Sequence, residues 1–590
     1  MTLDMARYPH HDGSTKYVER DGESVTAVRL LVPVRGSSSA PWLRLVQSGD
    51  AFYVTGELER TDHEGQWWRF GLAEHRMPYS YSFIYSSVEG AQVFVNAAGV
   101  HGMEQAGIFD FKPGTVRDLA PLWARRSTAY YIFLDRFSRS DRSGGRDHLS
   151  DWRDPVEVDY PANVRQFFGG DLWGVRDRIS YLTDLGVSMI MLSPFFPAPE
   201  SHRYCATDFD SVDEILGGMA ALASLTKALR ESGMHCVGDF TVNHCGADHP
   251  WFQHALGGGV ERSLFHVGVD EAGGYATYKD VVTLPKFNYA NEMAAHRLWG
   301  SSDAPVRSWL REPFRLDGWR LDAAAMVGRH GDIDVNARVA GEIRRAMTIE
   351  NPNAFHVAEI LHDPAPDLSD GRWSGSVMCA GFATPVRQFV AGLCTADAVC
   401  SALRQFASEL SWQSLVSSVA FVGSHDLPRL RSVAVSDAAA VTAHFMLMTF
   451  PGIPMVYGGD EMGVRGDTSD AGRVPLPWDD HSPQNDPYWQ SFRALIRLRK
   501  DAPWLSDAGL RWLAVTETMF AYERVGPGGS RMFCALASSA GTWTLQAPFW
   551  GYTLTSAFRQ GLDADAADGR IALTSSTAWT FGVWRVSRNP

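Results

Sequence analysis

The chain has 590 residues, too many for a single hydrophobic core, so its length predicts three or four domains. Hydrophobic residues make up 45% of the sequence and charged residues 21%, the balance of a soluble globular protein. The formal net charge of −14 argues against nucleic acid and anionic membranes as partners, since both are negatively charged, and leaves neutral ligands open.

The N-terminus and the cysteines indicate the compartment in which the protein works. Residues 1–12 lack the apolar stretch of an export signal, and no run approaches the length of a membrane span. The seven cysteines are odd in number and lack Cys-x-x-Cys spacing, which favours free thiols over disulfides or a zinc site. The sequence therefore predicts a cytoplasmic protein with no membrane partner.

Residues 1–122 are predicted to form a β-sandwich. Short stretches rich in Val, Leu, Phe and Tyr, at 26–34, 51–54 and 79–85, are separated by clusters of Gly, Ser and Asp. Short strands broken by turn residues in this way are typical of two packed antiparallel sheets.

Residues 123–502 have the pattern of a parallel (β/α)8 barrel, the TIM barrel of the α/β class. Short strands rich in Val, Ile and Met alternate with longer helical stretches. The predicted strands are 129–134, 187–192, 234–239, 318–322, 355–359, 375–379, 419–423 and 453–457, of which 375–379 has the weakest pattern.

Three further elements complete the predicted architecture. The third and fourth barrel strands are too far apart for one connecting helix, so a small subdomain is expected at about 245–295. Residues 486–500 have the pattern of the helix that closes the barrel. Strands return after Trp504, and residues 503–590 are predicted to form a C-terminal β-sandwich.

Three of the predicted barrel strands lead to a carboxylate. Asp322 ends the strand at 318–322, Glu359 ends the next, and Asp426 follows the strand at 419–423. Acidic side chains are costly behind buried strands unless they are paired or used. Because the reactive groups of a barrel lie at the carboxyl ends of its strands, these carboxylates are expected to meet and to be able to cleave a glycosidic bond.

The surroundings of each carboxylate predict its role. A retaining glycosidase needs an ionised nucleophile and a protonated acid about 5–5.5 Å apart. Asp322 is the expected nucleophile, because Arg320 on the same strand face would keep it ionised. Glu359 is the expected acid/base, because its apolar approach would raise its pKa. Asp426 is expected to stay ionised and to stabilise the oxocarbenium-like transition state.

Polar companions follow two of the same strands. Asp239, Asn243 and His244 end the third strand, and His425 precedes Asp426. The two histidines can hydrogen-bond the hydroxyl groups of a sugar held between the carboxylates. A metal role for them would require further His or Cys ligands at metal spacing.

These motifs resemble the regions that define the α-amylase family of retaining α-glycosidases, glycoside hydrolase family 13. The D-x-x-x-N-H, G-x-R-x-D, E and H-D regions of the family match residues 239–244, 318–322, 359 and 425–426, in order and in approximate spacing. The resemblance covers roughly residues 125–500 and includes the family's second and eighth strands.

The resemblance implies a role for each matched residue. It makes Asp322 the nucleophile, Glu359 the acid/base and Asp426 the transition-state stabiliser. It also places around the sugar at the cleavage site four further side chains: Arg320, His244, His425 and, beneath the ring, Tyr204.

Two features narrow the resemblance to the neopullulanase and cyclomaltodextrinase subgroup. Residues 284–288 are similar to its M-P-K-L-N segment, and the subgroup carries an N-terminal β-sandwich. The resemblance implies small α-glucans as substrates, cyclic or linear, including cyclodextrins and cyclic maltosyl-maltose, with α-1,4 and also α-1,6 links as targets. By analogy it implies a homodimer.

Departures from the subgroup pattern leave other activities open. Leu361 stands where a tryptophan is usual, and Cys205 follows Tyr204 where an aspartate is usual. Asp470 and Arg473 resemble residues that hold a non-reducing end in bacterial α-glucosidases. The alternatives are an exo-acting α-glucosidase or maltodextrin glucosidase, a transglycosylase or isomerase on the same scaffold, and a binding protein without catalysis, which the three intact carboxylates disfavour.

No cofactor is expected, and calcium is disfavoured. Relatives often carry a calcium-binding loop after the first barrel strand, where this chain has Arg139 to Gly145. Of that set only Asp141, together with Asp171, could serve as a ligand, short of the six to eight oxygen atoms that calcium takes. Arg139 would also place a positive charge at the site.

Overall fold

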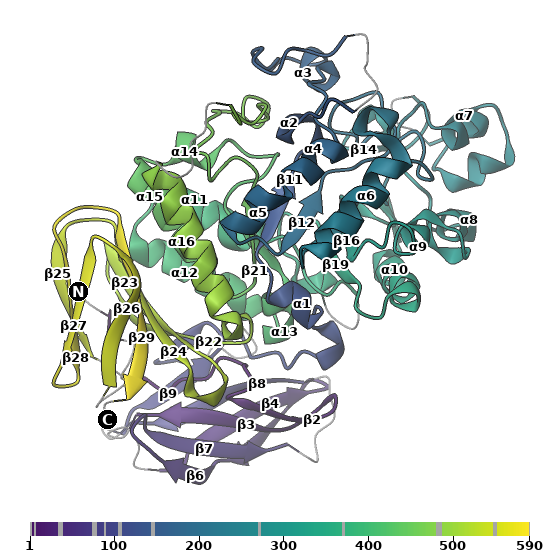
Figure 1. Ribbon diagram of the computed structural model, residues 1–590. Helices are drawn as coiled ribbons and strands as arrows, with labels where there is room; N and C mark the ends of the chain where they lie inside the picture. The colour runs from purple at the N-terminus through teal and green to yellow at the C-terminus, as the bar shows by residue number, and fades with distance from the viewer. Residues whose placement is uncertain are drawn as a thin grey trace.

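The computed structural model describes residues 3–4, 8–33, 39–72, 79–87, 90–103, 109–142, 148–269, 273–368, 372–479, 486–546 and 552–588. A parallel barrel lies in the middle of the chain, with an N-terminal sandwich below it and a C-terminal sandwich beside it in Figure 1. This confirms the predicted fold class. No helix in the described ranges is both long enough and apolar enough to span a bilayer.

The N-terminal sandwich consists of two antiparallel sheets. One sheet has the order β2-β3-β7-β6 and the other β10-β9-β8-β4-β5. Their apolar faces meet in one core that includes Leu30 and Phe70 from the first sheet and Leu43 and Phe83 from the second. Val34, the last residue of one predicted strand, lies outside the described residues. The strands are β2 (Val18–Asp21), β3 (Ser24–Val32), β4 (Trp42–Gln47), β5 (Asp50–Thr55), β6 (Glu57–Thr61), β7 (Gln66–Gly71), β8 (Ser80–Ser86), β9 (Gln92–Asn96) and β10 (Gly99–His101).

The barrel sheet is parallel and has the order β19-β16-β13-β12-β11-β21-β20. Its strands match the sequence prediction: β11 (Ala129–Ile132), β12 (Met189–Leu192), β13 (His235–Phe240), β16 (Gly318–Leu321), β19 (Phe355–Ala358), β20 (Val419–Phe421) and β21 (Ile453–Tyr457). Successive side chains alternate across the sheet. On β12, Met189 and Met191 lie in the barrel interior, whereas Ile190 and Leu192 pack in the cluster that joins strands to helices.

The segment predicted as the sixth strand closes the ring between β19 and β20. Ser376 forms a parallel bridge to Ala358, and Val377 forms one to Val419. Hydrogen bonds run from the Val377 nitrogen to the Ala358 carbonyl (3.0 Å) and from the Met378 nitrogen to the Val419 carbonyl (2.8 Å). The weakest of the predicted strands thus occupies the expected position, although only as isolated bridges.

Helices cover the outside of the barrel (Figure 1). In α10 the buried residues Val339, Ile343, Ala346 and Met347 recur at helical spacing and form one apolar face. From residue 439 to residue 449 the helix α15 is buried on all sides, because it lies between α16 and the C-terminal sheet. The helices of this region are α1 (Leu122–Arg125), α2 (Leu134–Phe137), α3 (Ala162–Arg165), α4 (Leu172–Asp177), α5 (Ile179–Leu185), α6 (Gly218–Glu231), α9 (Pro305–Ser308), α10 (Asn336–Glu350), α11 (Thr384–Val390), α12 (Ala396–Glu409), α13 (Trp412–Ser417), α14 (Leu430–Val433), α15 (Asp437–Thr449) and α16 (Pro487–Asp501).

The insertion after the third barrel strand is a small subdomain that lies against the mouth of the barrel. It contains α7 (Pro250–Leu256), the hairpin of β14 (Thr277–Tyr278) and β15 (Val281–Pro285), and α8 (Glu292–Ala295). An antiparallel bridge between His244 and Lys286 ties its end to the end of β13. Residues 284–288, singled out by the sequence, therefore lie beside the carboxyl ends of the strands.

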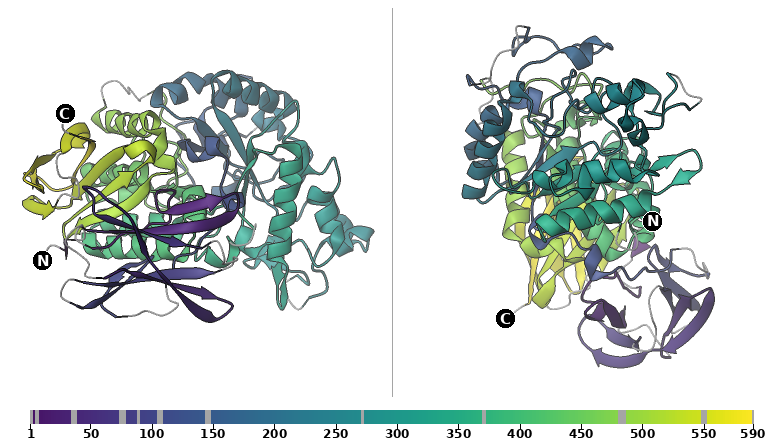
Figure 2. Two further views of the ribbon diagram at one scale, coloured as in Figure 1. Left: turned by 90° about the horizontal axis from the view of Figure 1, so that it is seen from below. Right: turned by 90° about the vertical axis from the view of Figure 1, so that its right-hand side faces the viewer.

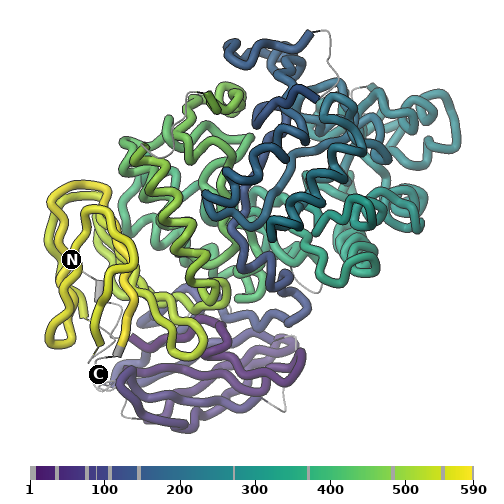
Figure 3. Tube along the Cα trace, viewed as in Figure 1, coloured from purple at the N-terminus to yellow at the C-terminus, as the bar shows by residue number. Residues whose placement is uncertain are grey.

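The C-terminal sandwich packs a sheet of order β1-β22-β23-β24-β29-β26 against a smaller sheet of order β25-β28-β27. Its strands are β22 (Gly509–Val515), β23 (Met519–Val525), β24 (Arg531–Ala537), β25 (Gly541–Gln546), β26 (Tyr552–Gln560), β27 (Leu562–Ala567), β28 (Arg570–Ser575) and β29 (Thr580–Arg588). The edge strand β1 (Leu3–Asp4) comes from the other end of the chain and pairs antiparallel with β22. Figures 2 and 3 show that the two terminal sandwiches lie side by side.

Candidate active site

The structure brings the three predicted carboxylates to the same end of the barrel. Asp322 directly follows β16 and Glu359 directly follows β19, and each residue is only 8% exposed. Asp426 follows β20 after a short loop, and its side chain is 47% exposed. The site therefore has two buried carboxylates and a third one at its mouth.

The guanidinium group of Arg320 joins the carboxylates at the bottom of this site. Its Nη1 lies 3.0 Å from Asp322 Oδ1 and 2.7 Å from Asp239 Oδ2, and its Nη2 donates to Glu359 Oε1. The other oxygen of Glu359 accepts a hydrogen bond from the Ala323 nitrogen (2.7 Å). Asp322 and Glu359 therefore contact one planar group, which fixes their carboxylates side by side.

The electrostatics at Asp322 differ from the expectation that Arg320 alone would keep it ionised. Burial and the nearby charge of Glu359 raise the pKa of Asp322 well above its ordinary value, although Arg320 opposes the shift. Burial likewise raises the pKa of Asp239 to about 6. The reason is that a single arginine is shared by three buried carboxylates, so that its charge compensates each only in part. Asp322 therefore holds a proton more readily than an exposed aspartate does.

The stacked rings of Tyr131, His425 and Tyr204 form a wall beside the carboxylates. The hydroxyl of Tyr204 donates to Asp239 Oδ2 (2.9 Å) and lies 2.9 Å from Nε2 of His425. The His425 ring is nearly parallel to the rings of Tyr131 and Tyr204, with centroid distances of 4.9 and 5.5 Å. Burial lowers the pKa of His425 well below its ordinary value, so the ring is neutral. It can therefore both donate and accept hydrogen bonds.

Two aromatic residues of this region were not singled out from the sequence. Tyr131 lies within β11, and its hydroxyl is 3.3 Å from Asp239 Oδ2. Tyr278 comes from the inserted subdomain and stacks on His244, with a centroid distance of 4.9 Å. The alternation of β11 places Tyr131 on the interior face, a signal that the sequence contained, whereas no local pattern identified Tyr278.

The other predicted residues of the third strand lie deeper in the wall. His244 and Asn243 are each 1% exposed, and Asn243 Nδ2 lies 3.2 Å from His244 Nδ1. Burial lowers the pKa of His244 to about 3. Within the described parts of the chain, its Nε2 has no hydrogen-bond partner. Since buried polar atoms normally have partners, this nitrogen is a candidate contact for a substrate hydroxyl.

Arg473 and Asp470 also reach the mouth of the site. Arg473 Nη1 lies 3.2 Å from Asp470 Oδ1, its Nη2 lies 3.5 Å from Asp426 Oδ1, and its Nε donates to the carbonyl of His425 (2.9 Å). Arg473 thus links Asp470 to the exposed carboxylate. In contrast, Leu361 is 44% exposed and offers no ring for stacking.

Of the residues considered for calcium, Asp171 has a structural role. Asp171 caps the N-terminus of α4 by accepting from the Gly174 nitrogen (2.6 Å), and its second oxygen accepts from the Ser140 nitrogen (3.0 Å). Asp141 is exposed, and residues 143–145 of the loop lie outside the described residues. Both carboxylate oxygens of Asp171 thus accept hydrogen bonds from the backbone.

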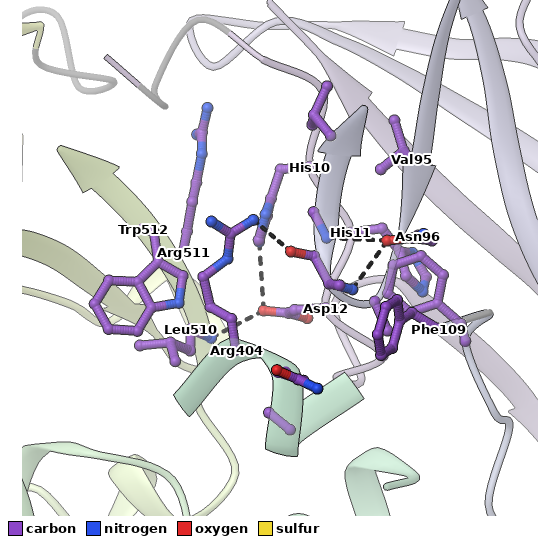
Figure 4. A pocket seen from close by; sticks show the side chains of 18 of the residues that line it. His10, His11, Asp12, Val95, Asn96, Phe109, Arg404, Leu510, Arg511 and Trp512 are labelled. Atoms are coloured by element: carbon purple, nitrogen blue, oxygen red, sulfur yellow. Dashed lines mark hydrogen bonds and ion pairs between the residues drawn. The ribbon is translucent and has the colours of Figure 1, made fainter. Parts of the chain in front are cut away.

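A separate cavity of about 590 Å³ lies where the two sandwiches meet α12, away from the carboxylates. Figure 4 shows His10, Asp12, Arg404 and Trp512 among its lining residues. Asp12 accepts a hydrogen bond from the Leu510 nitrogen (3.0 Å), and so joins the N-terminal segment to β22. None of the carboxylates around Arg320 lines this cavity. We therefore assign it to the junction between domains rather than to the reaction.

A parallel barrel with paired buried carboxylates at the carboxyl ends of its strands defines the class of barrel glycoside hydrolases. The model of the catalytic domain of α-amylase matches residues 131–264 and 268–496. The chain belongs to the α-amylase family, which confirms the resemblance seen in its motifs.

Individual relatives support this assignment. The chain is 31% identical over 491 residues to a cyclomaltodextrinase of Geobacillus thermopakistaniensis, a match that covers 79% of each protein. It is 30% identical over 408 residues to a maltogenic α-amylase of Bacillus acidopullulyticus, covering 66% of this chain and 65% of the relative. The fold is similar to that of a cyclic α-maltosyl-(1→6)-maltose hydrolase from Arthrobacter globiformis, with a TM-score of 0.68, 24% identity, and coverage of 80% of this chain and all of the other.

Proposed function

We propose that this protein hydrolyses glycosidic bonds in small α-glucans with retention of configuration, by means of a covalent glycosyl–Asp322 intermediate. The observation that carries the proposal is the contact of Asp322 and Glu359 with the same guanidinium group of Arg320. Retention requires two carboxyl groups close to each other on one sugar, one of them protonated. Burial and the nearby charge of Glu359 raise the pKa of Asp322, which supports the closeness of the two carboxyl groups.

In the first step, Glu359 gives its proton to the glycosidic oxygen while the Asp322 carboxylate attacks the anomeric carbon. The bond to the leaving group breaks, and its electron pair stays on the departing oxygen. In the second step, Glu359 takes a proton from water, which attacks the same carbon and releases Asp322. Asp426 is the stabiliser of the positive charge that develops on the sugar, and Tyr204 and His425 form the surface beneath the ring.

The relatives suggest the class of substrate. Relatives of this chain are named as cyclomaltodextrinases, maltogenic amylases and a cyclic maltosyl-maltose hydrolase. We infer that this chain acts on cyclic or linear maltooligosaccharides through α-1,4 links, with α-1,6 links as further targets. The exposed Leu361 favours substrates that need no aromatic stacking on the leaving-group side.

A second candidate function is exo-acting α-glucosidase activity. It is favoured by Arg473, which contacts both Asp470 and Asp426 at the mouth of the site. An arginine and an aspartate in that position can hydrogen-bond the terminal hydroxyl groups of a chain and so limit cleavage to its end.

The two candidates are separated by product analysis on γ-cyclodextrin, cyclic maltosyl-maltose, maltotetraose, panose and pullulan. Ring opening faster than attack on maltotetraose is expected for the first candidate. Glucose release from maltotetraose without ring opening would instead establish the exo-glucosidase. Products longer than the substrate would reveal transfer to a sugar acceptor.

We further propose that the protein forms a homodimer through its N-terminal sandwich and works in a reducing compartment, the cytoplasm. Support for the compartment comes from the seven cysteines, all of which are free thiols. Sedimentation of the full chain tests the proposed homodimer, for which a mass near twice 65.2 kDa is expected. A monomer at micromolar concentration would contradict it.

A further inference from the structure

Three potential metal ligands meet in the loop that carries Tyr204. Glu200, His202 and Cys205 lie between β12 and the short helix at Glu214–Leu216, in the spacing Glu-x-His-x-x-Cys. One carboxylate oxygen, one imidazole nitrogen and the sulfur atom all lie within 4.8 Å of one another. Cys205 occupies the position at which the resemblance to the subgroup leads one to expect an aspartate.

Both His202 and Cys205 contact one carboxylate oxygen of Glu200. His202 Nε2 lies 2.8 Å from Glu200 Oε2, and Cys205 Sγ donates to the same oxygen at 3.3 Å. Cys205 is 1% exposed, whereas the side chains of Glu200 and His202 are 13% and 16% exposed. The cluster is thus mostly dry but still open to an ion from solution.

The neighbouring residue holds the loop in this shape. Arg203 has a left-handed backbone (φ 62°), and its side chain is buried, with its Nε 2.9 Å from Asp213 Oδ2. Its Nη1 also donates to the Ser201 carbonyl (3.0 Å). Because this pair fixes the backbone between them, His202 and Cys205 need little further ordering to meet one ion.

We propose that Glu200, His202 and Cys205 form a binding site for a zinc-like divalent transition metal. Oxygen, nitrogen and sulfur donors are the ligands that zinc takes, and three protein ligands leave a fourth position for water. A carboxylate and a thiolate together neutralise a dication, so the occupied site carries no net charge in its partly buried position. In the free protein, burial and Glu200 raise the pKa of the Cys205 thiol, and binding releases its proton to solution.

Metal binding is expected to act on the active site through the backbone of Tyr204. In the structure the Tyr204 nitrogen donates to His202 Nδ1 (3.0 Å), so Nδ1 carries no proton there. A metal bound to Nε2 leaves the imidazole proton on Nδ1, which can then no longer accept this hydrogen bond. Since the hydroxyl of Tyr204 contacts Asp239 and His425, the ion should inhibit any reaction that uses this wall.

The test is titration of the full chain with Co²⁺, as a spectroscopic substitute for zinc, in the presence of a phosphine reductant. We expect one equivalent to bind, with thiolate-to-cobalt charge-transfer absorption, and Zn²⁺ to displace it. Cys205→Ser should remove the absorption and weaken Zn²⁺ binding by more than the roughly 10- to 100-fold typical of outer-shell changes. Cys394→Ser, which alters a partly buried thiol elsewhere, should bind as the wild type does.

Absence of the charge-transfer band in the wild type, or its persistence in Cys205→Ser, would overturn the proposal. Glu200→Gln gives a second measurement that keeps the thiol and removes one negative charge. It should weaken Zn²⁺ binding, and unchanged affinity would exclude Glu200 as a ligand. Binding is read directly in these experiments, so the result does not depend on which glucan the protein cleaves.

Discussion

Arg320 is the residue around which the site is arranged. It contacts Asp239, Asp322 and Glu359 from a position only 5% exposed. Removing one member of such a group leaves an uncompensated buried charge. This costs more folding stability than the intact ion pair contributes. The position of the Asp322 carboxylate therefore depends on Arg320, Asp239 and Glu359 together.

Substitution Asp322→Asn is expected to lower kcat roughly 10⁴- to 10⁶-fold, because the amide cannot form the glycosyl intermediate. The measurement is hydrolysis of a maltooligosaccharide, with correct folding checked by circular dichroism. Asp177→Asn is the control, since Asp177 is exposed on α4 and pairs with Arg142 at 3.4 Å. Wild-type rates in Asp322→Asn would disprove its role as nucleophile.

Substitution Glu359→Gln should move the acid limb of the pH–rate profile to lower pH. The negative charge of Glu359 raises the pKa of Asp322, and its removal makes Asp322 ionise at lower pH. α-Glucosyl fluoride is the appropriate substrate because its leaving group needs no acid. An unchanged limb would show that Asp322 and Glu359 are not electrostatically coupled.

At the scale of elements, the barrel strands were predictable because each is a short apolar run, and the site because carboxylates at strand ends converge. The features that the sequence did not predict also have physical causes. Tyr278 reaches the site through a contact between the insertion and His244, which no local pattern encodes. The sharing of Arg320 among three carboxylates is likewise a tertiary property, and so the raised pKa of Asp322 was missed.

The close contact of β16 with β19 gives a prediction about stability. A Cβ atom on Gly318 would lie 1.8 Å from the Phe355 carbonyl oxygen, so Gly318→Ala should destabilise by about 1–3 kcal/mol or more. Gly341→Ala in α10 is the control, since its added Cβ meets no atom within 4 Å and should stabilise by up to about 1 kcal/mol. Denaturant unfolding measures both. A neutral Gly318→Ala would contradict the tight packing of β16.

At the scale of the whole molecule, buried ion pairs join the two sandwiches. Arg531 on β24 contacts Glu523 Oε2 (3.0 Å) and also Glu64 of the N-terminal sandwich. Glu64 lies 3.0 Å from Lys16 Nζ as well. These contacts lower the pKa of Glu64 to about 2 even though burial alone would raise it. Its contribution to stability is therefore present above pH about 4.5 and is lost as the pH falls toward 2.

Substitution Arg531→Met should weaken the contact between the two sandwiches. Two buried carboxylates would lose a partner, at a cost of about 3–5 kcal/mol. We expect the first thermal transition to fall and cleavage by protease between the domains to increase. Arg60→Met is the control, because Arg60 is 45% exposed and its pairs should contribute at most about 1 kcal/mol. Equal effects of the two substitutions would show that the junction does not depend on Arg531.

The pairing of β1 with β22 has a practical consequence for handling the protein. The backbone of Leu3 and Asp4 covers the outer hydrogen-bonding groups of a strand in the opposite terminal domain. Deleting the first few residues would leave the N–H and C=O groups along that edge of β22 unpaired. Another chain can then add a strand to this edge. Shortened preparations should therefore self-associate and precipitate more readily, even though every group around Arg320 is intact.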